Sequence, residues 1–274
     1  MTYDTFNINS QNTNLFGQYW RPEHTKAVII LIHGMGEHSS RYTDSVVPEL
    51  LENGYAVLAY DNFGHGRSEG KSGHCPSYEA LMNAMEQAIK KATALFPNLP
   101  KYLYGHSMGG NLVMNYVLRK QHDIKGVIAT SPFLRLAFQP PKWKMALGKA
   151  MLNIWPSITL PSGLEVEAIS RVASEVKRYE EDPLVHDKVS PMFTFPIIEA
   201  GEWAIEHADA LNIPLLLLHG TGDRIIDYKG SVEFDDRSDM AELKLFRDGY
   251  HELHHDLCKK EFMQSVLDWL KVNA

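Results

Sequence analysis

A serine set between glycines carries the clearest chemical signal in this chain. Residues 105–109 read G-H-S-M-G and match the pattern G-x-S-x-G. The match follows a short apolar run at 101–104 and precedes a segment with helical spacing at 109–120, so it lies on a turn from a strand to a helix. Glycines fit there because a Cβ would meet nearby backbone in such a turn. The pattern predicts Ser107 as a nucleophile at the carboxyl edge of a sheet.

A serine hydroxyl is a poor nucleophile near neutral pH unless a base removes its proton and an acid orients that base. In sites of this kind the acid and the histidine follow the serine in the chain. Asp223 comes soon after the apolar run 213–218 and is the predicted acid. Asp227 is the alternative, although its position before Tyr228 also suits the cap of a helix.

The base is expected in the loop that follows the last apolar run, 242–246, where several histidines lie. His251 is the predicted base, and His254 and His255 remain alternatives. An imidazole held by a carboxylate at one ring nitrogen can accept the serine proton at the other. Together the three groups would catalyse acyl transfer through a covalent acyl-serine.

Acyl transfer also needs two backbone N–H groups that face the oxygen on which negative charge develops. One is expected from Met108, the residue after the serine, and the other from the loop after the first long apolar run. That loop, residues 33–36, reads H-G-M-G, and its glycines allow Met35 to turn its N–H toward the site. Met35 and Met108 are therefore the predicted oxyanion-hole donors.

A second motif competes with this interpretation. Residues 251–255 read H-E-L-H-H and match H-E-x-x-H, the pattern of zinc proteases. That motif works when both histidines project from one helix face and a third ligand completes the site. Gly249 lies two residues before the first histidine, so a helix is not expected to begin early enough. A zinc site would also leave the setting of Ser107 unexplained, and we predict no metal.

Six short apolar runs are typical of strands buried on both faces of a sheet. They lie at 27–32, 55–60, 101–104, 124–130, 213–218 and 242–246. Segments with helical periodicity lie at 77–95, 109–120 and 259–270. This alternation predicts an α/β fold with a mostly parallel sheet and helices on both faces. An antiparallel hairpin is expected before it, at 3–8 and 15–19.

Residues 132–196 interrupt the alternation, because they contain no convincing buried strand. We interpret them as a helical cap inserted between two parts of the core, 1–131 and 197–274. Several large apolar side chains in the insertion could line an acyl channel or touch a lipid surface. They are Phe138, Trp143, Met145, Met151, Leu152, Ile154 and Trp155.

Composition excludes several other classes of protein. The 274 residues carry a formal charge of −7 without a basic block, so no nucleic-acid partner is expected. Two cysteines are too few for a disulfide framework and suit free thiols in a reducing compartment. The first residues lack the pattern of a signal peptide, and no apolar run is long enough to span a membrane. We therefore expect a cytoplasmic protein, while its oligomeric state stays open.

With these motifs placed, the chain resembles the α/β-hydrolases, and more narrowly the monoacylglycerol lipase and lysophospholipase group, which is also classed with S33-type serine aminopeptidases. The matching stretches are residues 33–42, 61–68, 105–110, 182–185 and 219–223. Asn62 departs from the pattern, since the family often has an arginine there. The resemblance implies hydrolysis of a lipid ester, monoacylglycerol or lysophospholipid, to a free fatty acid by Ser107, Asp223 and His251. It implies no cofactor.

The resemblance also implies that Glu37, Arg41 and His254 recognise the hydroxyl groups of glycerol. Glu37 and Arg41 could instead form an ion pair over the start of a helix. Other functions remain open: a general carboxylesterase, a serine aminopeptidase or a non-catalytic binding protein. An aminopeptidase would need cap carboxylates for the substrate ammonium, and the available ones are Glu165, Glu167, Glu175, Glu180 and Glu181. Transient contact of the cap with a membrane surface is a further expectation.

Overall fold

An eight-stranded sheet forms the centre of the computed structural model, which describes residues 1–138 and 141–273 apart from the side chains of Lys142 and Lys144. The strand order is β1-β2-β4-β3-β5-β6-β9-β10. The first two strands form an antiparallel hairpin that joins β4 antiparallel, and all other neighbours are parallel. The strands are β1 (Thr2–Ser10), β2 (Thr13–Arg21), β3 (Ala27–Ile32), β4 (Tyr55–Tyr60), β5 (Lys101–His106), β6 (Gly126–Thr130), β9 (Leu215–Gly220) and β10 (Ala241–Phe246).

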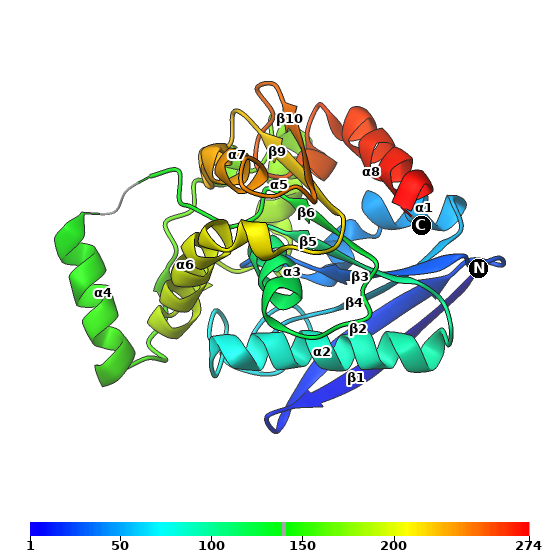
Figure 1. Cartoon of the computed structure of the whole chain (residues 1–274). Helices are drawn as coiled ribbons and strands as arrows, with labels where there is room; N and C mark the ends of the chain where they lie inside the picture. Colours follow the sequence, from blue (N-terminus) through cyan, green and yellow to red (C-terminus); the bar gives the residue numbers. More distant parts are fainter. Residues whose placement is uncertain (139–140, 274) are drawn as a thin grey trace.

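Helices cover both faces of this sheet (Figure 1). Strand β3 shows why its sequence is apolar throughout, because Val28 and Ile30 face one apolar cluster while Ile29 and Leu31 face another. The first cluster packs under α2 (Tyr78–Leu95), α3 (Met108–Arg119), α6 (Pro191–Glu206) and α7 (Tyr228–Asp235). The second packs under α1 (Val46–Glu52) and α8 (Lys259–Asn273). The predicted fold class is confirmed.

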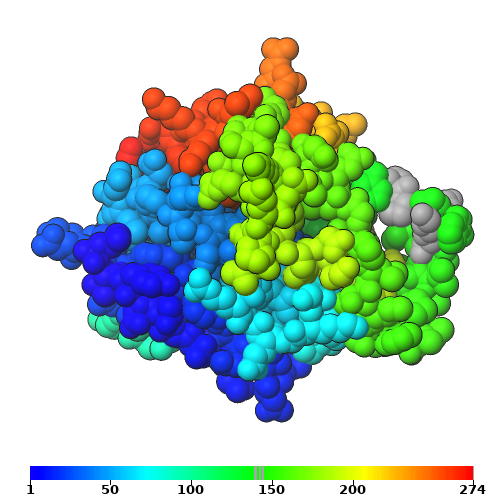
Figure 2. All heavy atoms as spheres, turned by 180° about the vertical axis from the view of Figure 1, so that it is seen from behind, coloured from blue at the N-terminus to red at the C-terminus, as the bar shows by residue number. Residues whose placement is uncertain are grey.

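The inserted segment is mainly helical and irregular. Its elements are α4 (Lys142–Ile154), the two-residue strands β7 (Leu160–Pro161) and β8 (Lys188–Val189), and α5 (Ala173–Glu181). Helix α4 lies at the edge of the molecule in Figure 1 and packs on α6, where Lys149 pairs with Glu199 at 3.0 Å. The part of the insertion after α4 lies across the middle of the face in Figure 2, between the N-terminal and C-terminal portions of the core.

Residue 196, the predicted end of the insertion, lies inside α6. Pro191 occupies the first turn of α6, where proline is tolerated, and Ser190 caps the helix by accepting the N–H of Phe193. Phe193 and Ile197 are fully buried in the core cluster, so α6 packs as part of the core. The predicted insertion, 132–196, also includes residues 139–140, and the predicted second part of the core, 197–274, includes residue 274. These three positions lie outside the described residues.

Membrane-spanning helices are absent from residues 1–138 and 141–273, since none there is both long and apolar enough to cross a bilayer.

Candidate active site

Ser107 occupies a strained turn between β5 and α3. Its φ of +52° lies in the left-handed region, which non-glycine residues rarely adopt. A Cβ at Gly105 would lie 2.3 Å from the carbonyl oxygen of Gly109, and a Cβ at Gly109 would lie 2.1 Å from that of Ile32. The Ser107 N–H donates to the Thr130 carbonyl at 2.9 Å, which fixes the turn against the neighbouring strand. The tight packing around both glycines therefore holds Ser107 in this strained turn.

The structure pairs Asp223 with His251, at 2.7 Å between Oδ2 and Nδ1. Asp223 lies just beyond β9, and His251 lies in the loop after β10, so parallel strand ends bring them together. Asp227, the alternative acid, accepts the N–H of Lys229 and caps α7 instead. A proton held on Nδ1 by the carboxylate leaves Nε2 of His251 as an acceptor.

Asp223 also accepts a hydrogen bond from a second histidine, which the sequence analysis did not identify. His219 lies with Nε2 3.2 Å from Oδ2 of Asp223, while the other carboxylate oxygen accepts the N–H groups of Ile225 and Ile226. Burial alone would raise the pKa of Asp223, but the charge and hydrogen bonds of His251 and His219 hold it well below its ordinary value. The sequence could have indicated this contact, because His219 lies at the end of β9, four residues before Asp223.

His251 is buried, and its loop is held from two sides. Ser131 Oγ donates to the His251 carbonyl at 2.8 Å, and the N–H of Tyr250 donates to Asp256 Oδ2 at 2.8 Å. Burial alone would lower the pKa of His251, but the charge and hydrogen bond of Asp223 outweigh it and raise the pKa above 6.5. The imidazole is therefore oriented and more basic than a free histidine.

Met35 and Met108 remain the predicted donors of the oxyanion hole. Met108 is the first residue of α3, and Met35 lies in the loop after β3. Neither N–H has an acceptor within the part of the chain that the structure describes. Gly36 shapes this loop, because its φ is +79° and a Cβ there would lie 2.6 Å from the His186 carbonyl oxygen of the insertion. Two backbone donors thus remain free beside the serine.

Ser107 and His251 line one cavity of about 540 Å³, which Met35 also lines. Its apolar wall includes Leu136, Met145, Phe195, Ile198, Ile225 and Ile226. Phe138 and Leu160 line it too and are more than half exposed, so they mark its opening. Of the apolar residues predicted from the insertion, Phe138 and Met145 reach the cavity wall, whereas Trp143, Met151, Leu152, Ile154 and Trp155 are not among its lining residues.

The three residues expected to recognise glycerol occupy different positions. Glu37 lines the cavity and accepts the Gly34 N–H at 2.6 Å, so it also anchors the oxyanion loop. Arg41 lies behind Glu37, which it contacts at 2.9 Å, and does not line the cavity. His254 is fully buried and stacks on Tyr42 at 4.8 Å between ring centroids. Of the three, Glu37 is the residue that the structure places at the cavity wall.

Arg41 makes its strongest contacts with Glu252, the residue after His251. Its Nη1 and Nη2 donate to the two Glu252 oxygens at 2.6 and 2.8 Å. Burial would raise the pKa of Glu252, but Arg41 and then His255 hold it well below 4.5. From the sequence, Glu252 was identified only as part of the zinc-like motif and not as a partner of Arg41. The two-carboxylate clamp on Arg41 ties the oxyanion loop to the loop that carries His251.

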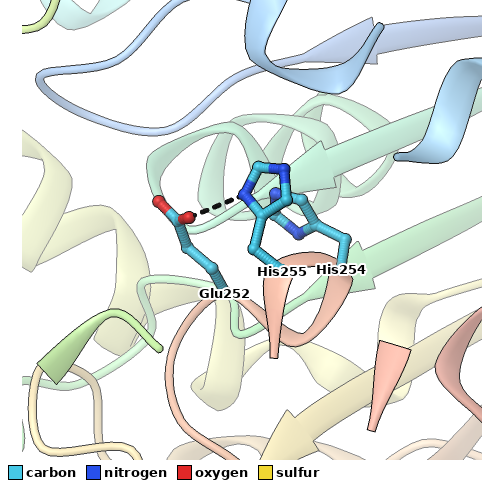
Figure 3. A group of neighbouring side chains, drawn as sticks. All are labelled: Glu252, His254 and His255. Atoms are coloured by element: carbon cyan, nitrogen blue, oxygen red, sulfur yellow. Dashed lines mark hydrogen bonds and ion pairs between the residues drawn. The ribbon is translucent and has the colours of Figure 1, made fainter. Parts of the chain in front are cut away.

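The zinc-like motif does not form a helix. Residues 253–255 make a single 3₁₀ turn, and His251 is bound to Asp223. Glu252, His254 and His255 do gather, with potential ligand atoms within 4.8 Å of one another (Figure 3). However, both Glu252 oxygens already accept from the Arg41 guanidinium, so a divalent cation bound there would lie against a fixed positive charge. This donor set does not suit a metal.

Comparison with known proteins agrees with this architecture. The family model described as serine aminopeptidase, S33, matches residues 23–257. The chain is 32% identical to rat monoglyceride lipase over 265 residues, which cover 95% of this chain and 86% of the relative. It is 34% identical to an uncharacterised abhydrolase domain-containing protein of Dictyostelium discoideum, of whose length it spans only 28%.

Among solved structures, the chain is similar to the monoacylglycerol lipase of Paleococcus ferrophilus. The TM-score is 0.88 and the identity 33%, with coverage of 95% of this chain and 99% of that one. The family model and both of these similar proteins cover most of the chain. The chain belongs to the S33 serine aminopeptidase family of α/β-hydrolases and is a serine hydrolase.

Proposed function

We propose that this chain hydrolyses monoacylglycerol to a free fatty acid and glycerol through an acyl-serine intermediate. The observation that carries the proposal is the shared cavity, which has Ser107 and His251 on its wall beside a predominantly apolar lining. The rat and Paleococcus relatives, whose names give the same substrate class, support it. A small ester with one long apolar chain fits a cavity that is polar near the serine and apolar elsewhere.

In the proposed reaction, Nε2 of His251 takes the Ser107 proton while Oγ attacks the ester carbonyl. The N–H groups of Met35 and Met108 stabilise the oxyanion of the tetrahedral intermediate. As that intermediate collapses, His251 gives its proton to the leaving glycerol oxygen. Water then repeats the sequence, and the acyl-serine bond is cleaved to release the fatty acid. Asp223 keeps His251 in the required tautomer and stabilises its charged form.

Rates on a substrate panel test this proposal. The panel compares mono-, di- and trioleoylglycerol, p-nitrophenyl esters of increasing chain length, and an aminoacyl arylamide. We expect the highest kcat/KM on monooleoylglycerol, because one acyl chain fills the apolar lining and the small alcohol fits beside His251. Preference for the arylamide would overturn the proposal. Labelling of Ser107 by a fluorophosphonate probe tests separately whether the chain is a hydrolase or a non-catalytic binding protein.

The cap does not supply the carboxylates that the aminopeptidase alternative was expected to use. None of the five glutamates considered for binding a substrate ammonium lines the cavity of the described chain. These are Glu165, Glu167, Glu175, Glu180 and Glu181. The family name alone therefore does not identify an amide substrate for this member.

The partner of the cap is, in our proposal, a lipid surface. Leu147 and Ile154 of α4 are 57% and 75% exposed, and the neighbouring Trp155 is 56% exposed. Phe138 and Leu160, which line the cavity, are 55% and 56% exposed. Exposed apolar side chains on the cap and at the cavity would let the substrate pass from a bilayer into the cavity with little contact with water.

A further inference from the structure

Two acidic residues line the cavity near His251, where the leaving alcohol would bind. Glu252 directly follows His251, and Glu37 follows the oxyanion loop. Both residues line the cavity, and each side chain is only 3% exposed. In the proposed mechanism His251 protonates the alcohol oxygen, so the remaining substituents of the alcohol must lie beside His251. That position brings them next to Glu37 and Glu252.

A single guanidinium compensates only part of this charge. Arg41 contacts Glu37 at 2.9 Å and Glu252 at 2.6 Å, but it lies behind them and does not line the cavity. Burial would raise the pKa of both carboxyl groups, but Arg41 keeps both below 4.5. Near neutral pH these three side chains therefore carry two negative charges and one positive charge, and the two acidic residues line the cavity, whereas Arg41 does not.

The other titratable side chains nearby do not cancel this net negative charge. Burial lowers the pKa of His106 to about 4, and it lowers the pKa of His254 well below 6.5, so both are neutral near pH 7. Lys188 also lines the cavity, but it pairs with Asp187 at 3.3 Å, and both side chains are about half exposed or more. His255 contacts Glu252 at 2.9 Å but, like Arg41, does not line the cavity. A negatively charged group bound beside His251 would therefore lie next to Glu37 and Glu252 in the cavity wall.

We propose that Glu252, together with Glu37, selects the alcohol part of the ester by charge. A neutral alcohol with free hydroxyl groups, such as glycerol, can donate hydrogen bonds to the carboxylate oxygens. An alcohol that carries a phosphate brings negative charge and acceptors to the same place and is rejected. This inference rests on the proposed function and narrows it to neutral monoacylglycerol, excluding lysophospholipids with an anionic glycerol phosphate.

The test compares two substrates that share one ester, 1-oleoylglycerol and 1-oleoylglycerol 3-phosphate. The wild-type enzyme should favour the neutral ester by at least about tenfold in kcat/KM. Glu252→Gln removes one of the two negative charges and leaves Arg41 paired with Glu37. The preference for the neutral ester should therefore fall by about tenfold. Glu180→Gln is the matched control, because Glu180 is exposed on α5 and lies outside the cavity wall. Its preference should equal that of the wild type.

A wild-type preference below about threefold, or an unchanged preference in a folded Glu252→Gln enzyme, overturns the inference. If that variant does not fold, the wild type still decides. The ethers 1-O-hexadecylglycerol and 1-O-hexadecylglycerol 3-phosphate are then compared as competitive inhibitors of p-nitrophenyl butyrate hydrolysis. Weaker inhibition by the phosphate supports charge selection, and equal inhibition refutes it. Failure to cleave any monoacylglycerol would refute the proposed function while the inhibitor ratio still measured the charge preference.

Discussion

The core side and the cap side of the cavity differ in how deeply their side chains are buried and in how firmly they are held. On the core side, Ser107, Asp223, His251 and Glu252 are nearly inaccessible, and the side chains of the last three bind partners from distant parts of the chain. On the cap side, α4 exposes large apolar side chains, and its ion pair Lys149–Glu199 is more than half exposed. Acid–base chemistry needs positions fixed to a fraction of an ångström, whereas binding a flexible acyl chain does not. The comparison implies that substitutions on the two sides will act on different observables.

The largest effect is expected from Ser107→Ala. Loss of the nucleophile should lower kcat by about 10⁴-fold or more, because the acyl-serine can no longer form. The midpoint of thermal unfolding should hardly change, and relief of the positive φ is not expected since alanine is strained there too. A coupled assay for released glycerol and a thermal melt measure the two quantities. Retention of near-wild-type hydrolysis would remove the serine from the mechanism.

Arg41→Met should give the largest loss of stability. The change leaves two buried carboxylates without their cation, at a cost of about 3–5 kcal/mol in the free energy of unfolding. Wild-type Glu37 and Glu252 have lowered pKa values, so the stability they contribute is present above pH 4.5 and is lost as the pH falls through their folded-state values. Without Arg41, burial would raise the pKa of both carboxyl groups, so they would take up protons at a higher pH than in the wild type and lose their buried charge. The deficit of the variant should therefore shrink on acidification, as urea titrations at pH 7 and pH 4.5 can show.

Lys149→Met on the cap side is the matched control for that experiment. Its ion pair with Glu199 spans 3.0 Å but is exposed, so the loss should be at most about 0.5 kcal/mol. Equal losses in the two variants would break the distinction between the core and cap sides of the cavity.

His219→Leu should produce an intermediate change in catalysis. It removes one of two histidine donors to Asp223, which makes that carboxylate a stronger partner for His251 and raises the pKa of His251 further. Because the reaction needs neutral His251, the acidic limb of kcat/KM, already expected above pH 6.5, should move to higher pH. We expect kcat to fall by about tenfold. His219→Gln retains a donor and should restore much of the profile, while an unshifted limb in the leucine variant would argue for a purely structural role.

The smallest effect is expected on the cap surface. Leu147→Ser combined with Ile154→Ser should weaken sedimentation with phosphatidylcholine vesicles by a few-fold, about the loss of two partly inserted side chains. Hydrolysis of soluble p-nitrophenyl butyrate should stay unchanged, because neither residue lines the cavity. Equal binding of the variant and the wild type to vesicles would contradict the proposed lipid contact.

The sequence by itself determined the parts of this protein that obey local rules. Continuous apolar runs identified the strands of the parallel sheet, although β9 begins at Leu215 and β6 at Gly126, each two residues later than expected. Glycines at 105 and 109 pointed to the elbow, because backbone crowding at a strand-to-helix turn excludes a Cβ. Strand order and the positions of loops after strands led to Asp223 and His251, which the structure brings within 2.7 Å.

Tertiary structure alone decided what depends on partners distant in the chain. The α1 helix, only seven residues long, carried too little periodicity to be recognised, and α6 continues through Pro196 because packing on α3 compensates for the interrupted helix. The pairing of Arg41 with Glu252 joins positions 211 residues apart, and no local pattern predicts it. Charge balance at the cavity wall depends on which side chains are brought into contact and on how deeply they are buried, and the chain fixes both only when it folds.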